Sequence, residues 1–167
     1  MGERVRTFLL AGLAVVLAAC TQAISKDALR TADPALTFSR LIKSPESYRG
    51  KRILTGGEIL STSARDGETW VEVLQKPLGW RDEPEDTDES HGRFLVRIPG
   101  FADPAIYAPR KKITVLGEVE GQRVQRLKEM DYAYPVLLPL EHHLWKPPGE
   151  GDARFHFGIG AGVGINR

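Results

Sequence analysis

The chain has 167 residues, of which 41% are hydrophobic and 27% charged, and its formal net charge at pH 7 is +1. This balance lacks the basic surface that displaces counterions from phosphates, so it excludes nucleic acid as a partner. The length suits one domain with a sizeable core. The sole cysteine, Cys20, has no second cysteine in the chain for a disulfide, so the fold must rest on that core.

The first 20 residues have the pattern of a bacterial lipoprotein signal. Arg4 and Arg6 supply a basic start, residues 8–19 carry no charge, and Leu17-Ala18-Ala19-Cys20 matches a lipobox. The uncharged run is too short to cross a bilayer as a helix. We expect removal of residues 1–19 as a signal peptide and attachment of a diacylglycerol and an N-acyl chain such as palmitate to Cys20. The alternative is an ordinary export signal in which Cys20 is a bystander.

The residue after the cysteine bears on the final location. In enteric-type lipoproteins an Asp there tends to retain the protein at the inner membrane, and this chain has Thr21. By that resemblance we expect a lipid-anchored domain on the outer membrane, facing the periplasm, where several acyl chains hold it firmly. Loss of residues 1–19 removes two of the 23 basic residues and one of the 22 acidic residues, so the mature domain is neutral.

Residues 20–35 mix small, polar and charged side chains without a clear period, which predicts a mobile linker. The folded domain is expected over residues 36–148. It begins with a short helix, because Leu36, Phe38, Leu41 and Ile42 have near-helical spacing and Ser44-Pro45 ends the pattern.

Five strands are expected after this helix, over residues 52–61, 69–74, 93–98, 112–120 and about 133–145. The pair Gly56-Gly57 predicts a bulge or a sharp bend in the first strand, and the turn at residues 65–68 predicts a hairpin. Residues 77–92 are rich in Asp and Glu, which predicts a long exposed loop, the acidic loop. Asp103 and Pro104 can start a helical turn before the fourth strand. The domain is therefore predicted to be mainly β, a small five-stranded OB-like barrel with a short helix.

Residues 149–167 form a Gly-rich tail in which apolar residues alternate with glycine or histidine from Phe155 to Ile165. A strand with this pattern has one apolar face and one nearly bare face. We expect the tail to contact the membrane surface or a second copy of the chain. A strand that closes the barrel, or a disordered tail, is the alternative.

A series of short motifs follows the lipobox in a fixed order: Pro45-x-x-Tyr48-x-Gly50, Gly56-Gly57, Glu72-Val73 before Pro77-Leu78, Gly92-Arg93-Phe94-Leu95, Gly100-Phe101-x-Asp103-Pro104-x-x-Tyr107, Thr114-Val115-x-Gly117, Tyr134-Pro135 and His143-Leu144-Trp145. They cover about residues 17–145. In these motifs the chain resembles the Slp family of starvation-inducible outer membrane lipoproteins of Gram-negative bacteria. The resemblance implies an outer membrane location and a link to starvation or stationary-phase stress, and it implies no known reaction.

The sequence contains no recognisable catalytic or metal-binding motif. His142 and His143 are adjacent, so in a strand they point to opposite faces and cannot bind one metal from that strand. The acidic loop lacks the spacing of a calcium-binding loop. Nucleophile elbows, phosphate loops and dinucleotide fingerprints are absent from the sequence. We therefore expect a protein that is not an enzyme and that carries no cofactor beyond the lipid on Cys20.

The tryptophans favour an alternative, because OB-type barrels often bind ligands on aromatic-lined faces. Trp70 and Trp145 are expected in strands, where they can belong to the core. Trp80, flanked by Arg81 at the mouth of the acidic loop, is expected to be exposed, and these two residues are expected to mark a ligand or partner surface. The main prediction is a non-catalytic envelope role. The alternative is a periplasm-facing module that binds a ligand, an envelope protein or a second copy, and a concave face of clustered aromatics and arginines would favour it.

Overall fold

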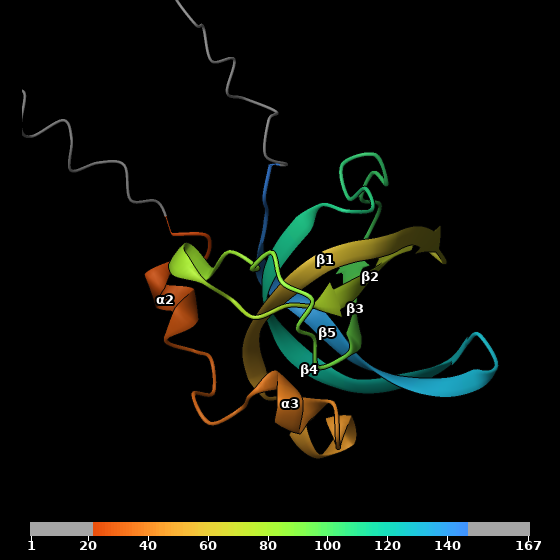
Figure 1. Cartoon of the computed structure of the whole chain (residues 1–167), viewed down its shortest axis with the longest axis horizontal. Coiled ribbons are helices and arrows are strands. Elements are labelled where there is room, and N and C mark those ends of the chain that lie inside the picture. The colour runs from red at the N-terminus through yellow and green to blue at the C-terminus, as the bar shows by residue number, and fades with distance from the viewer. Residues whose placement is uncertain (1–21, 147–167) are drawn as a thin grey trace, which may run out of the picture.

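The computed structural model describes residues 22–146 (Figure 1). Its elements in chain order are α2 (Lys26–Leu29), α3 (Phe38–Leu41), the 3-10 helix η2 (Pro45–Tyr48), β1 (Arg52–Arg65), β2 (Glu68–Gln75), the 3-10 helix η3 (Trp80–Asp82), β3 (Arg93–Pro99), β4 (Lys112–Leu127) and β5 (Met130–Leu144). The expected signal peptide, Cys20 and the Gly-rich tail lie outside the described residues. Within the described range, no helix has the length and apolar character needed to cross a membrane.

The five strands form a closed barrel in the order β1-β2-β3-β5-β4. Neighbouring strands are antiparallel except β3 and β5, which pair in parallel at Leu95–Val136 and Val96–Leu137. The first half of β1 pairs with β4 and the second half with β2, so β1 closes the barrel. The predicted fold class, a mainly β five-stranded barrel of OB type with only short helices, is confirmed.

Alternation along the strands fills the barrel with apolar side chains. In β2, Val71 and Val73 are fully buried, whereas Trp70 and Glu72 face outward. Phe38 of α3 packs on this core, and α3 lies against one end of the barrel (Figure 1). Burial of each such side chain stabilises the fold by about 1.5–3 kcal/mol. The other members of the core are Leu36, Leu41, Ile53, Ile59, Phe94, Val96, Ile113, Val115, Val119 and Leu137.

The glycine pair of β1 lies where this strand passes from one neighbouring strand to the other. A Cβ atom on Gly57 would lie 1.9 Å from the Leu74 carbonyl oxygen, and one on Gly56 would lie 2.6 Å from the Ile113 carbonyl oxygen. Both neighbouring backbones come this close because the pair carries no side chains. The pair therefore occupies a tight corner of the barrel, while the register shift of β1 falls between Ile59 and Ser61.

β4 and β5 extend beyond the predicted strands and form a two-stranded arm, the β4–β5 arm (residues 121–127 and 130–136). Most side chains of its β4 half are exposed, so the sequence shows no alternation of buried residues there. Register shifts at Leu116/Gly117 and Val119/Gly121 bend the hairpin. In Figure 1 the turn of this arm and the β1–β2 turn lie on the side of the molecule opposite α2.

The segment predicted as a mobile linker is packed on the domain from residue 22 onward, so this prediction is wrong there. The Ser25 hydroxyl caps α2 by accepting a hydrogen bond from the Ala28 backbone. Glu141 of β5 accepts hydrogen bonds from the Ser25 backbone N–H (2.9 Å) and hydroxyl (2.7 Å), and these bonds lower the pKa of Glu141. Ile24 is only 1% exposed. A single buried isoleucine creates no repeating hydrophobic pattern, so the sequence does not predict this contact.

Candidate functional site

Outward side chains of β2 and β3 meet those of neighbouring strands on one face of the barrel. The register places Trp70 between Ser63 of β1 and Arg97 of β3. The β4–β5 arm supplies the remaining side, where Arg123 pairs with Tyr134 across the two strands. This surface, the β2–β3 face, consists of Ser61, Ser63, Arg65, Glu68, Trp70, Glu72, Arg93, Leu95 and Arg97 from the barrel strands, and Arg123, Gln125, Tyr132 and Tyr134 from the arm.

Aromatic rings form the floor of the β2–β3 face. Tyr132 and Tyr134 pack with ring centroids 4.5 Å apart and planes inclined at 58°. The Arg123 guanidinium carbon lies 4.6 Å from the ring centroid of half-buried Trp70, a cation–π arrangement. These rings belong to a hydrophobic cluster distinct from the barrel core, made of Trp70, Leu95, Tyr132, Tyr134 and Val136.

Glu72 connects the strands that make up this face. Its carboxylate accepts hydrogen bonds from the Arg93 guanidinium (2.8 Å), the Ser61 hydroxyl (3.1 Å) and the Tyr134 hydroxyl (3.2 Å). The hydrogen bond to Glu72 raises the pKa of Arg93. Burial, followed by the charge of Glu72, raises the pKa of Tyr134. At neutral pH the arginine is therefore charged and the tyrosine protonated, so the network holds the floor of the face in place.

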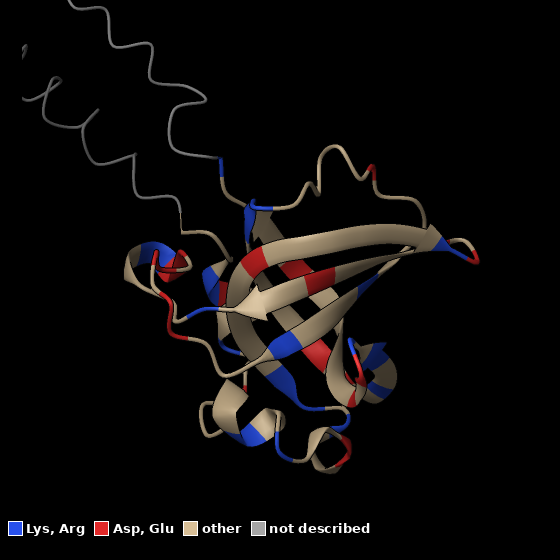
Figure 2. Cartoon of the chain, turned by 45° about the vertical axis from the view of Figure 1, so that its right-hand side comes forward, with Lys and Arg blue, Asp and Glu red and all other residues tan. Residues whose placement is uncertain are grey.

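Charged residues of both signs lie side by side on the barrel (Figure 2). Arg97 bridges Glu68 of β2 and Glu120 of β4, and these carboxylates, Glu120 most strongly, raise the pKa of Arg97. Unlike Arg93 and Arg97, Arg65 and Arg123 have no carboxylate within ion-pair distance among residues 22–146. The β2–β3 face therefore carries uncompensated positive charge beside the Trp70 ring.

Two hollows open on this face. The first has a volume of about 170 Å³ and is lined by Ser61, Ser63, Arg65, Trp70, Glu72, Leu95, Arg123 and Gln125. The second, of about 530 Å³, lies at the turn of the arm and is lined by Arg93, Leu127, Lys128, Glu129 and Met130. In OB-type barrels the ligand-binding face is that of strands 2 and 3, flanked by the β1–β2 and β4–β5 turns. The position and the lining of these hollows therefore fit a binding site.

The sequence-predicted surface at Trp80 and Arg81 lies elsewhere, beyond the opposite end of β2. Trp80 is 80% exposed, so its predicted exposure is confirmed. The Arg81 guanidinium carbon lies 5.3 Å from its ring centroid. Together with Gln22 and Lys26 they line a hollow of about 390 Å³ beside α2. These two residues therefore do not join the β2–β3 face.

The acidic loop was expected to be long and exposed, and the structure holds part of it against the barrel. Pro84 is buried, and Leu78 forms a β-bridge with it. The Thr114 hydroxyl of β4 donates a 2.6 Å hydrogen bond to the Asp82 carbonyl oxygen. The sequence pattern misses this docking because it rests on Leu78 and Pro84 within a strongly charged segment and on one threonine of a distant strand.

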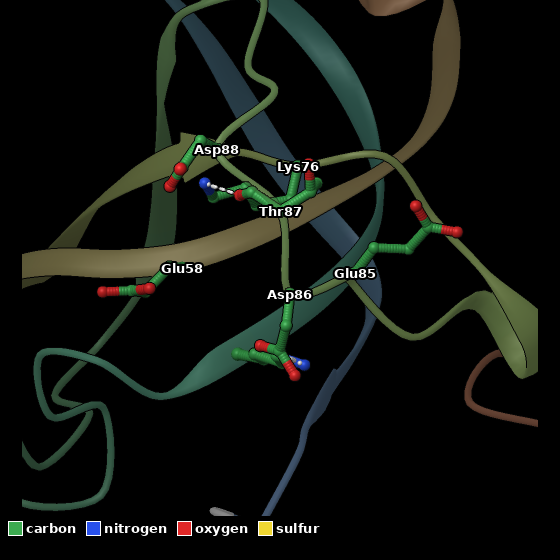
Figure 3. Close-up of a pocket in the computed structure, with 7 residues that line it drawn as sticks. Glu58, Lys76, Glu85, Asp86, Thr87 and Asp88 are labelled. Atoms are coloured by element: carbon green, nitrogen blue, oxygen red, sulfur yellow. Dashed lines mark hydrogen bonds and ion pairs between the residues drawn. The ribbon is translucent and has the colours of Figure 1, made fainter.

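Two lysines hold the acidic half of this loop. Lys76 donates a hydrogen bond to the Thr87 carbonyl oxygen (Figure 3), and Lys112 lies 2.9 Å from the Asp86 carboxylate. Burial lowers the pKa of Lys112, but the bonds to Asp86 and Glu83 outweigh burial, so the pKa is raised. The hollow here, about 310 Å³, is lined by Glu58, Lys76, Glu85, Asp86, Thr87, Asp88 and Lys112. The bonds from Lys76 and Lys112 therefore fasten the loop to the barrel.

The histidines point to different partners, as the strand geometry predicts. His142 shares a 2.7 Å hydrogen bond with the Tyr107 hydroxyl, whereas His143 packs edge-on against Trp145 with centroids 4.7 Å apart. The described part of the chain contains no group of three or more His, Cys, Asp and Glu side chains that could hold a metal ion.

The sequence predicts the barrel that forms the β2–β3 face, but its pattern does not show which residues meet on that face. Trp70 lies half-buried on the outer surface, and Trp145 follows β5 with its indole N–H donating to the Thr114 hydroxyl at 2.9 Å. Neither belongs to the barrel core. The alternation of β2 could have shown this for Trp70, because a core containing Val71 and Val73 leaves Trp70 on the outside.

Comparison with known proteins identifies the family. The family model described as "Outer membrane lipoprotein Slp family" matches residues 17–158. An uncharacterized protein of Haemophilus influenzae is 32% identical over 96 residues, which cover 57% of this chain and 52% of that relative, so the chain spans about half the relative's length. No solved structure matches. Because the family match covers most of the sequence, the chain belongs to the outer membrane lipoprotein Slp family.

Proposed function

We propose that the mature chain is a lipid-anchored binding protein of the outer membrane that faces the periplasm, with a non-catalytic envelope role linked to starvation or stationary-phase stress. The family match and the Leu17-Ala18-Ala19-Cys20 motif support acylation of Cys20. The β2–β3 face carries the proposal of binding, because the Trp70 ring under Arg123 borders a hollow lined by hydroxyl, amide and guanidinium groups. This is the clustering of aromatics and arginines that favours a binding module.

The lining of that hollow favours an acidic saccharide as the ligand. The indole of Trp70 gives the hollow an apolar border for a sugar ring, and the hydroxyls of Ser61 and Ser63 can bond to sugar hydroxyls. Arg65 and Arg123 lack carboxylate partners in the described structure, so they are available for a carboxylate on the ligand.

A titration followed by NMR tests this proposal. The probes are a cell-wall disaccharide–tetrapeptide, which carries carboxylates, the neutral disaccharide chitobiose, and the free tetrapeptide. We expect the first probe to shift the Trp70 indole N–H signal. We expect Arg123→Gln to weaken its binding about tenfold or more, the loss that follows from removal of one charge-assisted hydrogen bond.

Arg126→Gln is the matched control, because Arg126 lies on the same strand with its side chain on the opposite face. It should leave the affinity unchanged. Equal losses in the two variants, or equal binding of the free tetrapeptide, would refute the acidic-saccharide site.

The anchor is tested separately in cells. Cys20→Ser should give unprocessed or soluble protein without a labelled acyl chain, and normal membrane fractionation of this variant would refute the anchor. Thr21→Asp should move the protein toward the inner membrane where an enteric-type sorting system operates. An unchanged density-gradient profile would count against the proposed basis of outer membrane sorting.

A further inference from the structure

The surface around Trp80 lies where the chain leaves the domain toward Cys20. Gln22 donates a side-chain hydrogen bond of 3.4 Å to the Asp82 carboxylate of η3 and lines the same hollow as Trp80. Cys20 precedes Gln22 by two residues, a distance of at most about 7 Å along an extended chain. An acyl anchor on Cys20 therefore brings the surface that carries Trp80 close to the membrane.

We propose that Trp80, together with Arg81 and Lys26, docks the domain on the phospholipid headgroups of the leaflet that holds the anchor; this rests on the proposed acylation of Cys20. Trp80 is 80% exposed, and an indole suits a membrane interface because its ring is apolar and its N–H is polar. Lys26 and Arg81, which line the same hollow, are attracted by anionic headgroups.

The acidic residues next to Trp80 are engaged with the rest of the domain. Asp82 accepts the hydrogen bond from Gln22, and Glu83 pairs with Lys112 at 3.4 Å. Of the four other carboxylates of the loop, Glu85, Asp86 and Asp88 line the separate hollow over Lys76 and Lys112. The described lining of the hollow that Trp80 shares with Lys26 and Arg81 contains no carboxylate, so it can meet a headgroup surface.

The docked orientation directs the β2–β3 face away from the membrane. Glu141 fixes Ser25 at the start of α2, so the domain cannot swing freely about a long linker. In Figure 1, α2 and the adjacent η3 lie on one side, and the β1–β2 and β4–β5 turns lie on the opposite side. A domain held by α2 and η3 therefore exposes its binding face to the periplasm.

Fluorescence quenching in vesicles tests the docking. The full chain, purified from membranes with its acyl groups, is reconstituted in vesicles of phosphatidylethanolamine and phosphatidylglycerol whose acyl chains carry bromine. Trp80→Phe should remove most of the lipid-dependent quenching of tryptophan emission. Trp70→Phe is the control, because Trp70 lies near the start of β2, whereas Trp80 follows the end of that strand. This variant should leave the quenching intact.

Mass spectrometry of the same sample reads the acylation of Cys20, so the two proposals can fail separately. An acylated chain whose quenching is unchanged by Trp80→Phe, or is lost with Trp70→Phe, would overturn the docking alone. A chain without acyl groups would overturn the anchor, and the docking with it.

Discussion

Gly57 has the closest backbone contact of the described glycines, because its missing side chain lets the Leu74 carbonyl oxygen approach. Gly57→Ala should destabilise the domain by about 3 kcal/mol or more, since backbone atoms of two paired strands would have to move. Denaturant unfolding measures the change. Gly79→Ala is the control, because its Cβ would meet only the flexible Glu85 side chain, and it should change stability by less than about 1 kcal/mol. Similar losses in both variants would contradict this account of the barrel corner.

His142 gives the domain a pH dependence. Burial, followed by the charge of His143, lowers the pKa of His142 below its ordinary value of 6.5. Below pH 6.5 the unfolded chain therefore binds a proton that the folded domain resists, so stability is lost as the pH falls toward the folded-state pKa. We expect the melting temperature to fall less steeply from about pH 7 to about pH 5 in His142→Gln, which keeps a polar partner for Tyr107. An unchanged slope would refute this role of His142.

At the scale of elements, the segment that contains α2 is part of the folded domain. Ile24 is 1% exposed, so Ile24→Ala should destabilise the domain by about 2–5 kcal/mol, the cost of emptying a buried aliphatic site. Val124→Ala, at a position 58% exposed, should change stability by less than about 0.5 kcal/mol. Thermal unfolding of both variants decides the point, and a neutral Ile24→Ala would restore the linker predicted from the sequence.

The elements differ in how well their sequence predicts them. β2 was predictable because each buried residue alternates with an outward one, and the hairpin turn because Asp66 and Gly67 favour the positive φ angles that they adopt. The β4–β5 arm was not, because in its β4 half (residues 121–127) most side chains are exposed on both faces and so carry no burial pattern. The β2–β3 face combines residues from all five strands, and only the folded barrel brings Arg123 of β4 near Trp70 of β2.

At the scale of the whole molecule, the barrel separates two proposed contacts. α2 and η3, which begins with Trp80, lie on one side, and the turns that flank the β2–β3 face lie on the other (Figure 1). Because the charges on the barrel are mixed in sign, long-range attraction contributes little, and selection of a ligand falls to local groups such as Arg123 (Figure 2). We therefore expect the ligand of the anchored domain to approach from the periplasm.

Site-specific photocrosslinking in intact cells tests the central claim, that the β2–β3 face binds an acidic saccharide of the envelope. A photoreactive amino acid is placed in the acylated chain either at Gln125, which lines the hollow beside Trp70, or at Val124, which points to the opposite face of the same strand. The account predicts a saccharide adduct from position 125, identified by mass spectrometry, and none from position 124. Equal adducts from the two positions, or an absence of saccharide from position 125, would contradict it.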